Sequence, residues 1–226
     1  MLVGDLQLKK HIENELSWEP SINSAAIGIA VKDAVVTISG CVDSYAERHA
    51  VEQAVMHIRG IRALANELEV RLPAESERHD EDIARAIAEA FAWNAGIPKD
   101  VIKAQVAHGW VTLEGAVKWN YQRKLAEQAI ARLMGVKGVS NQITIKSLPL
   151  QNDVKARIES ALKRNAELDA EGIKITVQGN KVTLSGKVQS LAARISAEEA
   201  AWKAPGVGCI EDNLQITPDV ERVRFN

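Results

Sequence analysis

The side chains that most often carry out catalysis or bind metals are few in this chain and far apart. The five histidines show no pair at i and i+4, and neither H-E-x-x-H nor C-x-x-C occurs. Cys41 and Cys209 belong to no motif and are expected to be buried, reduced thiols. No G-x-S-x-G motif is present. We therefore expect no enzyme, no metal site and no cofactor.

One acidic run, residues 79–82, could hold a cation. It lies where a linker meets an expected helix, and acidic residues at that place commonly stabilise the helix dipole. Helix capping is therefore the favoured interpretation. Asp80 and Asn152 are the expected N-caps of their helices.

A second cluster combines basic and aromatic side chains in one short segment. Its members are Lys118, Trp119, Tyr121, Arg123 and Lys124. Aromatic and cationic residues on a loop suit a membrane interface or an anionic partner. The more ordinary alternative, which we favour, is that amphipathic side chains cover the core.

Three further tryptophans have a structural and a functional interpretation. Trp18 and Trp93 both follow an expected helix, and packing against the core is favoured over an interdomain or ligand contact. Arg164 stands at the matching place later in the chain. Trp202 falls on an expected helix and is predicted to be a core residue.

Composition excludes several classes of protein. The net charge is −2, and counting by segment gives about −3 for residues 1–72, +2 for 77–148 and 0 for 149–218. Nucleic-acid binding is therefore not expected. No apolar run is long enough to span a membrane, and residues 1–10 lack the features of a secretory signal. We expect a cytoplasmic protein, or a periplasmic one if a signal has been removed.

The elements that position these residues come from an internal repeat of about 70 residues. Its anchor is a β-patterned run ending in glycine: Val36–Gly40, Val111–Gly115 and Val182–Gly186. A second glycine follows twenty residues later, at Gly60, Gly135 and Gly206. An arginine recurs as Arg48, Arg123 and Arg194, and an amide or acid recurs as Asn66, Asn141 and Asp212. All six glycines are interpreted as structural turn residues.

Each repeat predicts the order helix, strand, strand, helix, strand. Apolar residues at three- and four-residue spacing mark the first helix, and alternation marks the strands. Hairpin turns are expected at 32–33, 107–109 and 178–180, and second helices at 44–58, 119–133 and 190–203. The predicted fold is α+β, with three tandem αββαβ units. Each unit is a three-stranded mixed sheet with two helices on one face.

The expected unit boundaries are 1–72, 77–148 and 149–218, with a tail at 219–226. An αββαβ unit of this size resembles the BON domain family. The resemblance rests on Val111–Val117, which reads V-x-L-x-G-x-V, and on Gly135–Ile143, which reads G-V-x-x-V-x-N-x-I. Asp212 departs from that pattern, in which an asparagine stands at this place.

The resemblance implies a bacterial, non-catalytic protein linked to osmotic and envelope stress, in a family thought to bind phospholipid or membrane surfaces. Most members are exported, and ion binding has been proposed among them. The leading hypothesis is therefore a binding module for phospholipid or another anionic surface. A cytoplasmic ion sensor of the potassium type or a small-ligand sensor is the alternative, and a protein-interaction scaffold is a second one.

Overall fold

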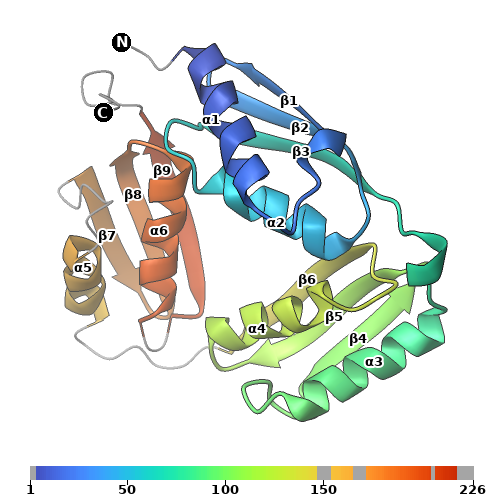
Figure 1. The fold of residues 1–226 in the computed structure, drawn as a ribbon. Coiled ribbons are helices and arrows are strands. Elements are labelled where there is room, and N and C mark those ends of the chain that lie inside the picture. Colours follow the sequence, from blue (N-terminus) through green and yellow to red (C-terminus); the bar gives the residue numbers. More distant parts are fainter. Residues whose placement is uncertain (1–3, 147–153, 165–171, 205–206, 218–226) are drawn as a thin grey trace. The chain divides into compact units, whose positions relative to one another are not determined.

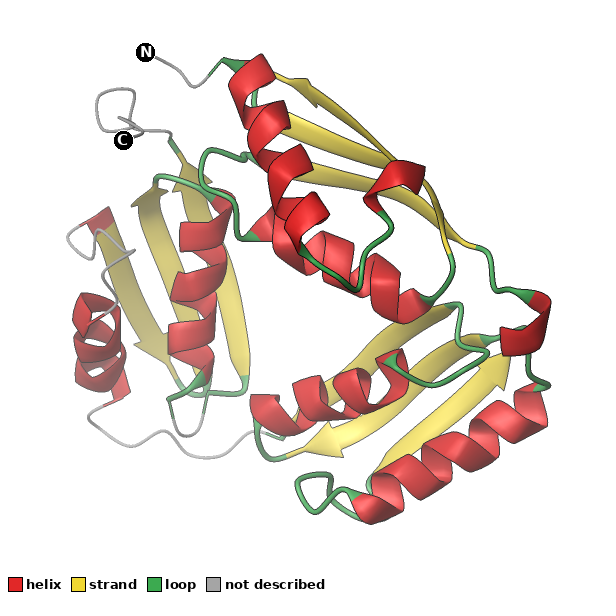
Figure 2. Ribbon diagram, viewed as in Figure 1, coloured by secondary structure: helices red, strands yellow, loops and turns green. Residues whose placement is uncertain are grey.

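The structure, a computed structural model, describes residues 4–146, 154–164, 172–204 and 207–217. Three sheets form, with the strand orders β1-β2-β3, β4-β5-β6 and β7-β8-β9. Two helices lie on one face of each sheet (Figures 1 and 2). The predicted α+β fold of three αββαβ units is therefore confirmed. We call them the first, second and third unit.

The elements of each unit follow the expected order. The first unit contains α1 (Asp5–Trp18), η1 (Ser24–Ala26), β1 (Ile27–Lys32), β2 (Val35–Val42), α2 (Tyr45–Met56) and β3 (Ala63–Val70). The second contains α3 (Asp80–Trp93), β4 (Ile102–Ala107), β5 (Trp110–Val117), α4 (Asn120–Ala131) and β6 (Gly138–Ile145), after η2 (Ala74–Ser76). The third contains α5 (Val154–Arg164), β7 (Ile173–Gln178), β8 (Lys181–Val188), α6 (Leu191–Trp202) and β9 (Cys209–Ile216).

The central strand of each sheet pairs with its two neighbours in opposite senses. β4 and β5 form an antiparallel hairpin, whereas β5 and β6 are parallel, with Leu113 opposite Asn141. β7, β8 and β9 repeat this arrangement. The parallel pair requires a crossover, and α4 or α6 supplies it.

The cores lie between each sheet and its helices because apolar residues alternate along the strands and form one stripe on each helix. In the second unit, Val111, Leu113 and Val117 are buried on β5. Ile83 and Ile87 face them from α3, and α4 contributes further buried side chains. Burial of these aliphatic groups is the main favourable term in folding a unit this small.

The anchor glycines adopt backbone angles that disfavour other residues. Gly40, Gly115 and Gly186 have φ of 124°, 146° and 124°. A Cβ on Gly115 would clash with the backbone carbonyl oxygen of Val101. Gly60 and Gly135 also have positive φ, at 94° and 86°, while Gly206 lies outside the described residues. The interpretation as structural turn glycines therefore has a geometric basis at five positions.

The hairpin turn of the second unit is held by Asp80, which the sequence analysis predicted to be an N-cap. Asp80 is the first residue of α3, not its N-cap, which is His79. Its two carboxylate oxygens accept from the backbone N–H groups of His108 (2.7 Å) and Gly109 (2.8 Å). These amides hold the pKa of the Asp80 carboxyl below its usual range, Gly109 most strongly.

The first unit repeats this clamp. Asp5 accepts from the N–H groups of Asp33 (2.9 Å) and Ala34 (3.1 Å). Its turn is therefore Asp33–Ala34, one residue later than predicted, and both residues have positive φ, as a two-residue hairpin turn of type I′ requires. Asn152, the other expected N-cap, lies outside the described residues.

In every unit the second helix ends one or two residues earlier than the sequence predicts. After Ala131 the chain tightens, since the N–H of Leu133 donates to the carbonyl of Ile130 at 2.9 Å. This three-residue turn leads into Gly135, whose positive φ redirects the chain toward β6.

Candidate functional site

The basic and aromatic cluster lies at the start of α4. Trp119 is the N-cap and retains 36% exposure, and Tyr121, in the first turn, retains 58%. Lys118 and Lys124 are exposed, whereas Arg123 is half-buried. Four of the five predicted residues are thus exposed at the start of α4. We call Lys118, Trp119, Tyr121 and Lys124, with Lys146 described below, the α4 patch.

The backbone of the α4 patch is fixed by Gln122. Its side-chain oxygen accepts from the N–H groups of Lys118 and Trp119, both at 3.1 Å. This is half of a capping box, and the other half is missing because an indole has no acceptor for the amide of the third helical residue. Gln122 therefore fixes the backbone of residues 118 and 119, and the Trp119 side chain takes no part in capping the helix.

The other two units use a serine at this position. In the first unit, Ser44 accepts from the N–H of Glu47 at 3.1 Å. In the third, Ser190 accepts from the N–H of Ala193 at 3.1 Å. Serine is among the best N-caps, whereas tryptophan is not. The second unit therefore lacks a favourable cap where it displays an aromatic ring.

The electrostatics of the α4 patch also run against helix stability. The first turn of α4 has no acidic residue, while that of α3 has Asp80, Glu81 and Asp82. The N-terminus of a helix carries partial positive charge, so lysines beside it are unfavourable to the helix. The same combination attracts anions, because the backbone N–H groups, the N-terminal end of the helix dipole and the lysines are all positive.

Lys146 joins the α4 patch through the sheet, which the sequence reasoning missed. β5 and β6 are parallel, with Val117 opposite Ile145, and the N–H of Lys146 donates to the carbonyl of Val117 at 2.7 Å. The exposed Lys146 therefore follows directly beside Lys118. The two lysines are far apart in sequence, and only the parallel register signals that they are neighbours.

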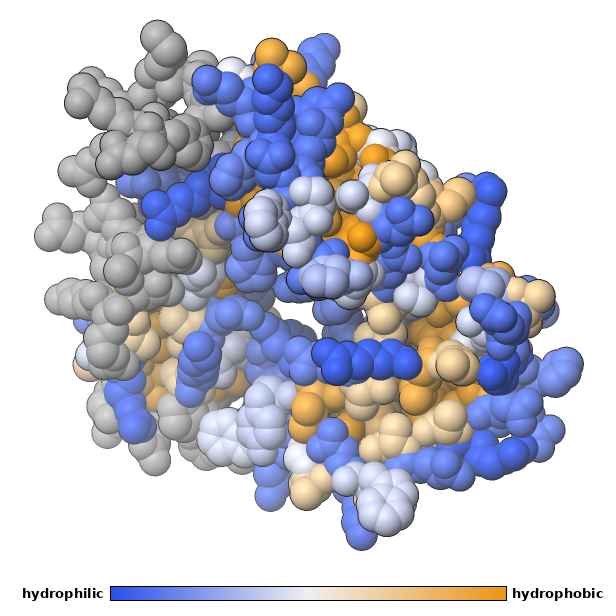
Figure 3. All heavy atoms as spheres, in the orientation of Figure 1, coloured by the Kyte–Doolittle hydropathy of each residue, from blue (hydrophilic) through white to orange (hydrophobic). Residues whose placement is uncertain are grey.

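No other unit combines these residue types. At the matching positions the first unit has Asp43, Ser44, Ala46, His49 and Arg71, so it has a basic residue in place of Lys146 but neither the Trp nor the Tyr ring. Gln189, Ser190, Ala192 and Thr217 stand at those of the third. Hydrophilic side chains are abundant on the face shown in Figure 3, so one exposed lysine alone does not indicate a site. The clustering of lysines with two aromatic rings distinguishes the second unit.

Arg123 belongs instead to a link between the second helix and the third strand. The side-chain amide of Asn141 donates to the carbonyl of Arg123 (3.2 Å) and to the carboxylate of Glu127 (2.9 Å). The Asn141 side-chain oxygen accepts from the N–H of Ile143 at 3.2 Å. In the first unit, Asn66 likewise donates to Glu52 at 3.2 Å. The asparagine therefore has a structural role.

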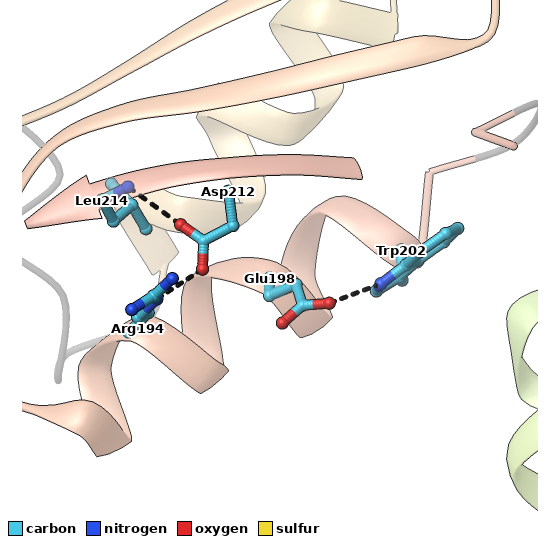
Figure 4. Close-up of polar contacts among 5 residues, drawn as sticks. All are labelled: Arg194, Glu198, Trp202, Asp212 and Leu214. Carbon is cyan, nitrogen blue, oxygen red and sulfur yellow. Dashed lines mark hydrogen bonds and ion pairs between the residues drawn. The ribbon is translucent and has the colours of Figure 1, made fainter. Parts of the chain in front are cut away.

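The third unit rebuilds this link around a carboxylate (Figure 4). Asp212 accepts from the guanidinium of Arg194 at 2.5 Å and from the N–H of Leu214 at 2.9 Å. Glu198, the counterpart of Glu127, accepts instead from the indole N–H of Trp202 at 3.1 Å. The departure at Asp212 is thus compensated by an ion pair. Trp202 is half-buried and packs on the core, close to its predicted place.

Trp18 and Trp93 do not pack on the core, so the favoured prediction was wrong. They retain 84% and 89% exposure. Each ends its helix two residues beyond the apolar stripe, which reaches Leu16 in α1. Two residues turn a helix by about 200°, which places the ring on the opposite side. The alternative, an interdomain or ligand contact, stays a prediction.

The cysteines also differ from expectation. Cys41 is half-buried and Cys209 is exposed. Cys209 is the first residue of β9, an outer strand of its sheet, where alternate side chains face solvent.

In the part of the chain that the structure describes, we found no helix long and apolar enough to cross a membrane.

Fold and surface together define a class: a tandem α+β repeat protein that presents aromatic and charged side chains on its units. The BON domain model matches residues 4–71, 79–147 and 151–218. The chain therefore belongs to the BON domain family.

A curated relative is osmotically-inducible protein Y of Escherichia coli strain K12. It is 26% identical over 148 residues, which cover 64% of this chain and 74% of that protein. Two solved structures of CdsD, a structural protein of the type III secretion system of Chlamydia trachomatis, also align. One is 14% identical over 95% of this chain and 97% of that chain, with a TM-score of 0.27. The other, its C-terminal domain, is 13% identical over 94% and 98%, with a TM-score of 0.26. TM-scores this low support no functional comparison.

Proposed function

We propose that this chain is a bacterial stress-related, non-enzymatic binding protein whose second unit engages anionic phospholipid surfaces through the α4 patch. Membership of the BON family and the likeness to an osmotically-inducible protein support the stress-related role. The clustering of exposed lysines and aromatic rings at an uncompensated helix N-terminus supports the lipid surface. It is the observation on which the proposal rests.

The chemistry of each group fits a headgroup region. Trp119 and Tyr121 have an apolar ring and a polar tip, which suits the boundary between acyl chains and water. Lys118, Lys124 and Lys146 supply positive charge, each worth about 1 kcal/mol near an anionic membrane. Peripheral, salt-sensitive attachment is therefore the expected mode.

Co-sedimentation with phosphatidylglycerol-containing vesicles tests the proposal. We expect binding at low salt, release at high salt, and none to phosphatidylcholine vesicles. Lys118→Glu should weaken binding about fivefold or more. Lys103→Glu is the matched control, since it reverses an exposed lysine on β4 of the same unit. Equal losses in both variants would refute a localised patch.

Ion sensing, a protein scaffold and a cytoplasmic location stay predictions. No described contact favours one of them over another.

A further inference from the structure

The first unit has a pocket between α1 and the end of α2, with a volume of about 250 Å³. Its lining residues are Leu8, His11, Glu15, Ala54, His57, Ile58 and Arg59. Leu8, His11 and Glu15 stand at positions i, i+3 and i+7 of α1 and so share one side of the helix. The other four come from the last turn of α2 and the residues just after it.

The pocket has an apolar floor and a titratable rim. Leu8 and Ile58 are 3% and 6% exposed and, with the half-buried Ala54, form the floor. The four charged or titratable side chains are exposed at the rim: His11, Glu15, His57 and Arg59. A small apolar group can therefore be covered while an ionic group stays near water.

The ring of His57 is held in one orientation. Its Nδ1 lies 2.7 Å from the carbonyl oxygen of Gln53. Because a carbonyl only accepts, Nδ1 carries the proton and donates this hydrogen bond. The His57 ring is therefore fixed in place at the rim of the pocket.

The set is confined to the first unit. In the second unit Ala86, Ala90, Arg132 and Met134 stand at the positions of His11, Glu15, His57 and Arg59. Because that unit keeps the same fold with an alanine and a methionine there, the fold does not require the imidazole or the guanidinium. The two units thus provide matched substitutions for a test.

We propose that this pocket binds a small organic carboxylate with a compact apolar group. The apolar group would rest on Leu8, Ala54 and Ile58. A guanidinium pairs well with a planar carboxylate, so Arg59 is the main contact, with His11 and His57 beside it. Glu15, also at the rim, opposes an anion, so removal of its charge should strengthen binding.

The test is an NMR titration of the full chain with isobutyrate. We expect saturable shifts of the His11 and His57 ring signals, with millimolar affinity because the site is small and open. Glu15→Gln should tighten binding severalfold, because it removes a like charge at the rim. Arg59→Met and His11→Ala, which introduce the residues of the second unit, should each weaken it severalfold. Arg85→Met, on α3, is the control.

Three outcomes would overturn the proposal: no saturable shift, equal affinity for the neutral isobutyramide, or full affinity in Arg59→Met. Circular dichroism shows whether each variant remains folded. None of these residues belongs to the α4 patch, so this site and vesicle binding stand or fall separately.

Discussion

At the scale of single residues, two features recur among the units. A glycine near the end of the second strand has positive φ in all three units, and a Cβ at Gly115 or Gly186 would meet a carbonyl oxygen. In the first and second units, a carboxylate at the start of the first helix accepts from two N–H groups of the hairpin turn. The repeated glycines point to the first feature in the sequence. The pairing of carboxylate and turn was not predictable from local sequence, because Asp80 accepts from His108 and Gly109, which follow it by 28 and 29 residues.

Gly115→Ala should destabilise the second unit by about 2 kcal/mol or more, since it adds backbone strain and a contact with the Val101 carbonyl. Urea unfolding measures this. Gly28→Ala is the control, because its added methyl would meet chiefly the movable Ser39 hydroxyl, at 3.0 Å. Equal stability of the two variants would show that the Gly115 backbone relaxes freely.

Asp80→Ala should lower the melting temperature at pH 7, because the hairpin amides lose their acceptor. The native pKa of Asp80 is depressed, so its contribution is complete above the unfolded value of about 3.9 and is lost as pH falls through the native value. The difference from wild type should therefore narrow in acid. Glu81→Ala, in the same turn but 89% exposed, controls for the helix dipole. A gap that persists unchanged in acid would contradict this role.

At the scale of elements, the second helix and third strand are tied together differently in the three units. An amide bridges to glutamate in the first and second units, and an aspartate–arginine pair replaces it in the third. The sequence revealed the exchange at residue 212. It could not reveal that Glu198 turns to Trp202, since rotamer choice depends on the assembled helix.

Asn141→Asp should destabilise the second unit by about 1 kcal/mol, since it places a carboxylate against Glu127, now 2.9 Å from the amide. Adding Glu127→Gln should restore most of the loss. A double-mutant cycle from urea unfolding measures the coupling. Absence of coupling would mean that the two side chains do not interact in solution.

At the start of α4, the exposed Trp119 stands where the other units have a capping serine. Trp119→Ser introduces the cap of the other units and should leave the protein about 1 kcal/mol more stable than Trp119→Ala. Both variants should bind anionic vesicles more weakly than wild type, because both lose the ring. Thermal unfolding and co-sedimentation of the pair separate the two effects. Equal stability of the two variants would show that residue 119 does not act as an N-cap.

The order of the elements and the core residues were predictable, because the spacing of apolar residues reflects which side chains are buried and recurs in all three repeats. The exposure of Trp18 and Trp93 was also within reach, since each lies off the apolar stripe of its helix. Lys146 was not, because its proximity to Lys118 depends on a parallel strand pair. Local sequence patterns therefore predicted the helices and strands. The full composition of the α4 patch could be recognised only from the strand pairing in the folded unit.

At the scale of the whole molecule, three units share a fold but not a surface. The α4 patch belongs to the second unit and the histidine-lined pocket to the first. The boundaries 1–72, 77–148 and 149–218 stay a prediction. A single patch offers no avidity, so one unit should account for most of the vesicle binding and its salt dependence.

The most direct test transplants the third unit's residues into the patch and measures flotation with phosphatidylglycerol vesicles at low salt. The full set of substitutions is Lys118→Gln, Trp119→Ser, Tyr121→Ala, Lys124→Ile and Lys146→Thr. We expect that this variant, folded and with its melting temperature preserved, no longer floats with the vesicles. Undiminished flotation would contradict it and move any lipid contact to another surface.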